Sequence, residues 1–188
     1  FHDVIGHGGW SMDIHHPDAF YHAGPPTICH AVPAVYGIPY RSLYSKNIEN
    51  LFFAGRNISC THVAMSSTRV MGTCSVTGQT IGTAAALALK HNTTPRGVYQ
   101  HHISELQQIL MDDIPYFKRA IPELSRHAEI SHEILRDGIE RPVERETHCI
   151  FMAAGDSCEY RFAGKETVHE VRLIFDSDLE DKKNMRNK

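Results

Sequence analysis

The sequence predicts an α/β fold with additional helices and a short antiparallel β segment near its C-terminal end. The first observation is a short, continuously apolar run, "LFFAG" at residues 51–55, which is typical of a strand buried on both faces in a parallel sheet. The second is a helix-like run of small and apolar residues from Ser75 to Lys90. The third is the alternation of apolar and charged residues in "CEYRF", together with the β-strand composition of "VRLIF", which is typical of strands.

Residues 1–45 are expected to contain little regular structure. Residues 1–35 are rich in His, Gly and Pro and show no periodicity, which predicts loops with a single short strand at "TICHAV", residues 27–32. The next segment, 36–45, has strand composition interrupted by Pro39. Because proline cannot donate to a sheet ladder, this segment is expected to be an edge strand or an extended loop. "KNIEN", residues 46–50, is expected to be a turn.

A ligand is expected where the apolar strand ends. A polar connection over residues 56–74 leads from the strand into the helix, which Thr73 or Ser75 is expected to cap. Ligands of open α/β sheets bind at the carboxyl ends of strands, and the N–H groups at a helix start attract electron-rich oxygens. Gly78 and Gly82 each cost about 1 kcal/mol relative to alanine, so small residues here indicate a close approach to a sheet or a ligand.

Two further helices are predicted. Thr94 followed by Pro95 is a strong helix-start signal, and an amphipathic stripe continues this helix to about Met111. A third helix is expected within Pro122 to Arg136. After Gly138 the character changes, and strands are expected at "HCIFMA", "SCEYRFAG" and "ETVHEVRLIFDS", with "AGKE" as a hairpin turn.

Composition excludes several classes of function. The chain has 188 residues, 41% of them hydrophobic, and a net charge of -3, as in soluble globular proteins. There is no basic stripe for nucleic acid, and no apolar stretch reaches the roughly 20 residues of a membrane span. The five cysteines show no CxxC spacing, which predicts neither a disulfide framework nor a zinc site and is compatible with both a cytoplasmic and an exported protein.

The stretch "IENLFFAGRNISCTHVAMSSTRVMGTCSVTGQTIGTAAALALK" resembles the C-terminal FAD-contacting segment of FAD-dependent oxidoreductases of the glutathione-reductase-like flavoprotein superfamily. The shared pattern is a strand ending in Ala-Gly, a loop carrying His and Arg, and a helix with Gly-Thr-Ala-Ala-Ala. The resemblance covers residues 1–115 and is dense over 36–90. It implies the C-terminal part of a Rossmann-like FAD-binding domain, with FAD as the cofactor.

The resemblance also implies a domain plan. Residues 1–45 would belong to a substrate domain or active-site segment, and 46–115 would form the C-terminal FAD-binding segment. A helical linker is expected over 116–146. Residues 147–188 resemble the first strands of a β-sandwich, as in discoidin-like carbohydrate-binding modules. The chain opens on Phe1 and contains no G-x-G-x-x-G fingerprint, so it is expected to be a portion of a longer protein whose ADP-binding half lies upstream.

The resemblance assigns cofactor contacts to two groups of residues. Gly55, Arg56 and Asn57 would lie near the ribityl chain and the pyrophosphate of FAD. The second group would face the isoalloxazine ring or the ribityl chain, and it comprises Gly72, Thr73, Cys74, Gly78 and Gln79.

Flavin oxidation of a C–H bond needs a base or a substrate anchor near the flavin. His62 and Arg69 lie in the connection between strand and helix, and a similarly placed His and Arg hold a substrate carboxylate in fumarate-reducing flavoproteins. Arg41 in "IPYRS" is a second candidate anchor. His15 is a second candidate base, because Asp13 in "SMDIHHP" could orient its imidazole.

The sequence therefore predicts part of an oxidoreductase that transfers a hydride between a small organic substrate and FAD. It predicts no metal ligands, and it allows for association between copies of the chain. Two alternatives stay open. One is a non-catalytic glycan-binding protein that uses the C-terminal β segment. The other is a metal-dependent enzyme built on the histidines of residues 1–30.

Overall fold

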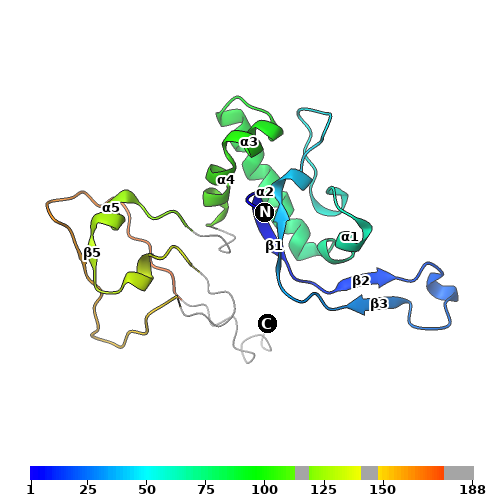
Figure 1. Cartoon of the computed structure of the whole chain (residues 1–188), viewed down its shortest axis with the longest axis horizontal. Helices are drawn as coiled ribbons and strands as arrows, with labels where there is room; N and C mark the ends of the chain where they lie inside the picture. The colour runs from blue at the N-terminus through cyan, green and yellow to red at the C-terminus, as the bar shows by residue number, and fades with distance from the viewer. Residues whose placement is uncertain (113–118, 141–147, 176–188) are drawn as a thin grey trace. The chain divides into compact units, whose positions relative to one another are not determined.

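The computed structural model of the chain describes residues 1–112, 119–140 and 148–175. The chain divides into two compact units, Phe1–Ile114 and Pro115–Lys188. Figure 1 shows the helices and strands of each unit. The first unit contains every candidate site residue.

Strands of the first unit form two antiparallel ribbons. β1 (Val4–Gly8) pairs with β4 (Tyr36–Pro39), and β2 (Met12–His15) pairs with β3 (Thr27–His30). A 3-10 helix, η1 (Ala19–Tyr21), lies in the turn of the second ribbon, which projects from the body of the unit (Figure 1). The expected strand within 27–32 is confirmed. β1 and β2 were not expected, because glycines and histidines are not typical strand formers.

Four helices complete the first unit. They are α1 (His62–Thr68), α2 (Met71–Lys90), α3 (Pro95–His101) and α4 (Ile103–Leu110). The predicted cap Thr94 is confirmed, since its side chain accepts from Gly97 N at 3.1 Å. The single helix expected up to Met111 is interrupted at His102, whose φ of -131° is not helical.

The start of α2 differs from the prediction. The helix begins at Met71, and its N-cap position is held by Val70, which makes no side-chain hydrogen bond. The predicted caps Thr73 and Ser75 therefore lie inside the helix. The "polar connection" also contains α1, with Thr61 as its N-cap accepting from Ala64 N at 3.2 Å.

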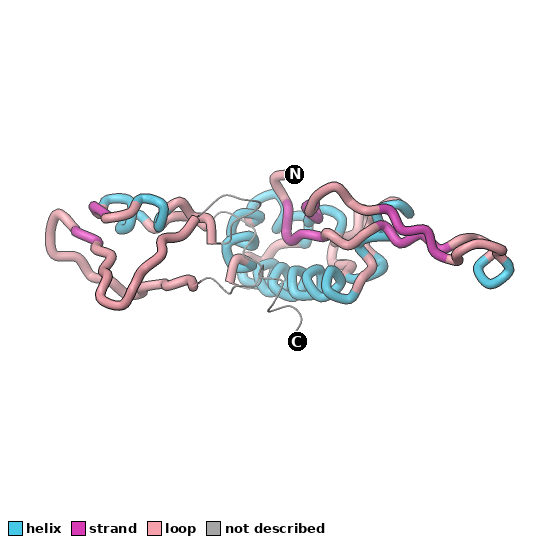
Figure 2. The backbone as a smooth tube through the Cα atoms, turned by 90° about the horizontal axis from the view of Figure 1, so that it is seen from below, coloured by secondary structure: helices cyan, strands magenta, loops and turns pink. Residues whose placement is uncertain are grey.

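The core of the first unit lies where α2 meets the β1–β4 ribbon and the helix pair α3–α4. Figure 2 shows α2 alongside the strands. Tyr40 is fully buried and donates from its hydroxyl to Pro95 O at 2.9 Å. The other large apolar side chains that are fully buried are Ile5, Leu43, Val98, Leu106, Leu110 and Met111.

The prediction of a parallel-sheet strand at "LFFAG" is wrong for the described residues. Phe53 N donates to Leu43 O at 2.7 Å, and Ser45 N donates to Leu51 O at 3.0 Å. The segment therefore forms its backbone hydrogen bonds in a local antiparallel contact, with an isolated bridge between Tyr44 and Phe52. Mixed helices and small sheets remain compatible with the α/β class.

The second unit holds less regular structure than expected. The predicted third helix is divided into α5 (Glu123–His127), β5 (Glu129–Ile130) and the 3-10 helix η4 (Glu133–Arg136). β5 pairs with β6 (Tyr160–Arg161), which lies within the expected strand "SCEYRFAG". An ion pair joins Arg119 to Glu140.

Two other strand predictions are wrong where the structure describes them. Residues 148–153 and 166–175 form no strand, and "AGKE" therefore closes no hairpin. A strand requires a neighbour to complete its hydrogen bonds, and the antiparallel pairing described in this unit is limited to β5 with β6. Residues 176–177 of the predicted strand lie outside the described residues. The assignment of 147–188 to a β-sandwich remains a prediction.

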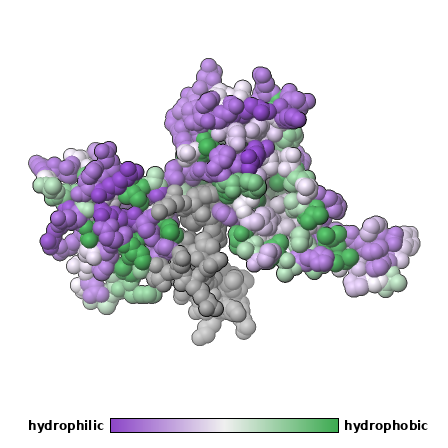
Figure 3. Space-filling model, viewed as in Figure 1, coloured by the Kyte–Doolittle hydropathy of each residue, from purple (hydrophilic) through white to green (hydrophobic). Residues whose placement is uncertain are grey.

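The surface of the first unit is not uniform. It is mainly hydrophilic over α3 and α4, and hydrophobic residues gather near the base of the β2–β3 ribbon (Figure 3). Leu51, Phe52 and Phe53 are half-buried. Among the described helices, none is both long and apolar enough to cross a membrane.

Candidate functional site

Helix α1 packs on β2 and presents one face to it. The helical positions 62, 65, 66 and 69 share this face because they are spaced three and four residues apart. Together with β2 they enclose a small pocket of about 90 Å³. The pocket is lined by Asp13, Ile14, His15, His62, Met65, Ser66 and Arg69.

The pocket brings together three of the four predicted catalytic residues. His62 begins α1, Arg69 ends it, and His15 ends β2. Met65, Ser66 and Ile14 were not predicted. Met65 and Ser66 lie on the same helical face as His62 and Arg69, so a helix predicted over this segment would have indicated both of them.

Arg69 and Asp13 form the charged centre of the pocket. Arg69 Nη2 donates to the backbone carbonyl of Asp13 at 2.7 Å and lies 3.2 Å from Asp13 Oδ2. The other carboxylate oxygen, Oδ1, is buried and has no hydrogen-bond partner among the described residues. A carboxylate accepts hydrogen bonds only, so Oδ1 is suited to an O–H or N–H group of a bound molecule.

The two histidines differ in their surroundings. His15 Nδ1 lies 3.3 Å from Thr27 Oγ1, and His15 Nε2 lies 4.0 Å from Asp13 Oδ2. An imidazolium at this position therefore has a counter-ion beside it. His62 is exposed in the first turn of α1.

The buried face of α1 is held by hydroxyl groups. Ser67 Oγ donates to Trp10 O at 2.5 Å and also lies 2.5 Å from the Tyr36 hydroxyl. Ser66 Oγ donates to Val63 O at 2.6 Å. The Ser67 contacts join α1 to β4 and to the segment between β1 and β2, whereas the Ser66 contact lies within the helix.

Arg41 does not lie in this pocket. Its guanidinium lies 3.3 Å from the carboxylate of the fully buried Asp3 and 4.8 Å from the centre of the Phe1 ring. Arg41 N also donates to Asp3 Oδ2 at 3.1 Å. A buried carboxylate requires such a partner, and the arginine is committed to this charge.

The predicted cofactor residues Gly55, Arg56 and Asn57 form the 3-10 turn η3 against α2. Gly55 has a φ of 73°, which favours glycine, and its N–H donates to Thr77 Oγ1 at 2.9 Å. Arg56 and Asn57 are exposed. Cys74 lies beside Gly55, because a Cβ atom at residue 55 would be 3.8 Å from its sulfur.

The remaining cofactor residues lie along the first half of α2. Gly72 is exposed, Thr73 is buried, and the Cys74 thiol donates to Arg69 O at 3.4 Å. A Cβ atom at Gly72 or Gly78 would meet no described atom within 4 Å. Gln79, the residue after Gly78, is exposed.

The predicted catalytic residue Arg69 lies next to the predicted cofactor residues at the start of α2. Arg69 is the C-cap of α1, and α2 begins two residues later at Met71. The first N–H groups of α2 have no side-chain cap, and such groups suit an electron-rich oxygen. This donor set, next to open space at Gly72, fits the flavin or ribityl portion of FAD.

Comparison with known proteins identifies the family of the chain. A search of curated proteins and a search of solved structures each gave no match. A family model described as "FAD dependent oxidoreductase" matches residues 1–110, which include the pocket, η3 and α2. Because the match spans more than half of its 188 residues, the chain belongs to the FAD-dependent oxidoreductase family, and its cofactor is FAD.

Proposed function

We propose that the chain contributes the substrate pocket and the flavin contacts of an enzyme that transfers a hydride between a small organic substrate and FAD. The observation that carries this proposal is the position of the pocket, whose Arg69 immediately precedes the uncapped start of α2. FAD, when bound, supplies the two-electron acceptor for the hydride. The volume of about 90 Å³ suits a small molecule or one end of a larger one.

Arg69 is assigned the role of substrate anchor. Both of its contacts with Asp13 use the Nη2 atom. A guanidinium has five N–H donors, so Nη1 and Nε are not used in these contacts and can hold a substrate carboxylate or another anionic oxygen. Because Asp13 fixes the guanidinium, little side-chain entropy is lost when the substrate binds.

His15 is assigned the role of base, with His62 as a hydrogen-bonding neighbour. A proton taken from the substrate by His15 produces an imidazolium beside the Asp13 carboxylate. Asp13 is the acidic residue among those that line the pocket, and its described contact with a histidine is with His15. The two histidines thus divide the roles that the sequence left open between them.

The flavin side is assigned to η3 and the start of α2. Gly55, Arg56 and Asn57 would contact the ribityl chain and pyrophosphate, and the N–H groups of Gly72 and Thr73 would face the flavin or its ribityl chain. Cys74 would lie beside them through its side chain, because its N–H donates to Val70 O at 2.9 Å. Gly78 and Gln79 would extend this surface by one helical turn. Since the chain has no G-x-G-x-x-G fingerprint, contacts with the adenosine portion are not assigned to it.

The substitution Gly72→Asp tests the flavin contact. An acidic residue in the first turn is favourable for the helix, and a Cβ atom at residue 72 meets no described atom within 4 Å, so the fold should be retained. A negative charge at this place should repel the electron-rich edge of the cofactor and weaken FAD binding about tenfold or more, measured by flavin fluorescence titration. Gly82→Asp, further along α2 and also unobstructed, is the matched control.

Arg69→Met tests the substrate pocket separately. In the FAD-loaded protein, this variant should retain the visible flavin spectrum but lose bleaching of the flavin by small carboxylate-bearing substrates under anaerobic conditions. Bleaching at the wild-type rate in the variant would refute the role of Arg69. Equal FAD affinity in wild type and Gly72→Asp would refute the placement of the flavin at α2.

A further inference from the structure

A second cluster of ionisable side chains lies at the opposite end of α2. His91 follows α2, His102 separates α3 from α4, and Glu105 lies in the first turn of α4. His91 Nε2 is 2.8 Å from Glu105 Oε2, and His102 Nδ1 is 3.7 Å from the same oxygen. The two imidazole rings stack with centroids 3.9 Å apart and planes inclined by 12°.

This arrangement has the composition and spacing of a metal site. The two nitrogens and the carboxylate oxygen all lie within 4.8 Å of one another. Ligand atoms bound about 2.0–2.1 Å from a tetrahedral zinc ion lie about 3.3 Å apart. The distances of 2.8 and 3.7 Å to Glu105 Oε2 bracket this value. Because a metal ion lies in the plane of each imidazole that binds it, the two stacked rings must turn toward a shared point to admit an ion.

We propose that His91, His102 and Glu105 bind a divalent transition metal ion of the zinc type. Two imidazoles and one carboxylate form a ligand set that zinc takes in proteins, with the fourth position left to water. The three side chains are between 25% and 33% exposed, so an ion and its water ligand can reach them. The site would join the end of α2 to the start of α4, far along the helix from the flavin contacts.

The ligands stand on elements that pack against one another. α2 contacts both α3 and α4, and Leu106, directly after Glu105, is fully buried. Positions of the three Cα atoms are therefore set by the core and need not be ordered by the ion. This lowers the entropic cost of binding.

Lys90 modulates the site. Its Nζ lies 2.7 Å from Glu105 Oε1, the oxygen that does not contact the imidazoles. The lysine thereby orients Oε2 toward His91 and His102, as hydrogen bonds to ligating carboxylates generally do. Its positive charge also opposes the binding of a cation, so Lys90→Gln, which retains a hydrogen-bond donor, should bind the metal several-fold more tightly.

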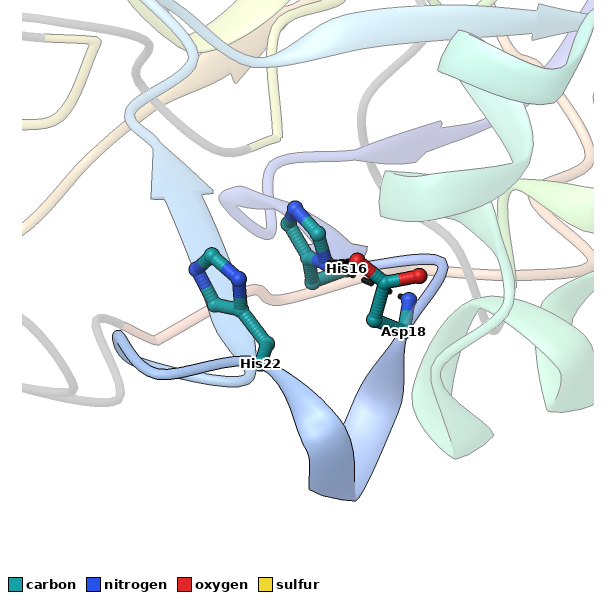
Figure 4. A group of neighbouring side chains, drawn as sticks. All are labelled: His16, Asp18 and His22. Atoms are coloured by element: carbon teal, nitrogen blue, oxygen red, sulfur yellow. Dashed lines mark hydrogen bonds and ion pairs between the residues drawn. The ribbon is translucent and has the colours of Figure 1, made fainter.

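A second group, His16, Asp18 and His22, supplies an internal control. Figure 4 shows that these residues lie around the turn of the β2–β3 ribbon. One nitrogen of His16 already accepts from Asp18 N at 3.2 Å, and the Asp18 side chain is 68% exposed. This group is less well fixed than the cluster at the end of α2, and no binding is assigned to it.

The test is titration of the metal-free 188-residue chain with Co²⁺, followed by displacement with Zn²⁺, with visible absorption as the readout. One equivalent should bind, and His102→Asn and Glu105→Gln should each weaken binding about tenfold or more. His91→Gln is a third, independent ligand variant, should one of the others fail to fold as judged by circular dichroism. The double variant His16→Asn/His22→Asn should bind as wild type does.

Metal binding should also raise the melting temperature of the wild type, because an ion bound only by the folded state stabilises it. The proposal is overturned if no Co²⁺ spectrum develops. It is equally overturned if the folded ligand variants retain the wild-type affinity, or if binding is lost in the His16→Asn/His22→Asn variant instead.

Discussion

The Arg69 guanidinium holds both the backbone and the side chain of Asp13, at 2.7 Å from its carbonyl oxygen and 3.2 Å from its carboxylate. One side chain thus ties the end of α1 to β2 across 56 positions of the sequence. Because the same side chain lines the pocket, the stability of this contact and the geometry of the site are linked. Substitutions at the two residues can separate these effects.

Replacing Arg69 by methionine should lower the free energy of unfolding by about 1–2 kcal/mol. The variant leaves the Asp13 carboxylate, which is 30% exposed, without its charge partner and removes the bond to the Asp13 carbonyl. Asp13→Asn should cost less, because the carbonyl still accepts from Arg69. Urea unfolding of both variants measures the difference, and an equal loss would mean that the backbone contact contributes nothing.

The sequence predicted the pocket residues better than the elements that carry them. His62, Arg69 and His15 were chosen for their chemistry, and the structure places them around one pocket. α1 was missed because "THVAMSSTR" is rich in Ser and Thr, which have modest helix propensity and favour caps and turns. Its Thr61 cap and its apolar positions carry a helical signal that was outweighed by this composition.

Tertiary contacts account for the remaining differences. Arg41 was predicted as a substrate anchor, but its guanidinium forms an ion pair with the buried Asp3, which is far away in the sequence. "LFFAG" has the composition of a central strand, but backbone pairing with residues 43–45 replaced a sheet ladder among the described residues. The Thr94–Pro95 start was predicted correctly because capping is local and needs no distant partner.

Gly55 and Gly78 should respond to alanine in opposite ways. Gly55 has a φ of 73°, so Gly55→Ala should cost about 1–2 kcal/mol in backbone strain. An added Cβ there would touch Cys74 only at 3.8 Å, so no clash contributes. Gly78 lies inside α2 with open space around it, and Gly78→Ala should stabilise by about 0.5–1 kcal/mol. Thermal unfolding monitored by circular dichroism gives the sign of each stability change. Destabilisation by Gly78→Ala would show that other atoms already pack against this face of α2.

Stability should fall on mild acidification, in part through His7. Burial lowers the pKa of His7, which lies on β1 opposite Gly37, below its usual value of 6.5. Below about pH 6.5 the unfolded chain takes up a proton at this residue while the folded chain resists it, so the free energy of unfolding decreases until the folded-state pKa is reached. Above about pH 6.5 both states are neutral at His7 and the effect vanishes.

The His7→Asn variant isolates this contribution from the other histidines. The loss of stability between about pH 7.5 and pH 5.5 should be smaller in His7→Asn than in wild type, as measured by urea midpoints. His2→Asn, at an exposed position near the chain start, should retain the full wild-type dependence. An unchanged pH dependence in His7→Asn would show that its burial is not maintained in solution.

The contact between Gly6 and Val76 should behave as a coupled pair. Gly6 lies on β1, and a Cβ atom at this position would overlap Val76 Cγ1 on α2. The stiff valine has little freedom to turn away, so Gly6→Ala should force β1 and α2 apart at a cost of about 1–3 kcal/mol. Val76→Ala removes the obstructing methyl group and leaves Cβ, which lies 3.7 Å from the added atom, an ordinary contact distance.

The double variant should therefore be more stable than Gly6→Ala alone, with a coupling energy of about 1–2 kcal/mol in a double-mutant cycle. Strict additivity would mean that β1 does not pack on α2 as described.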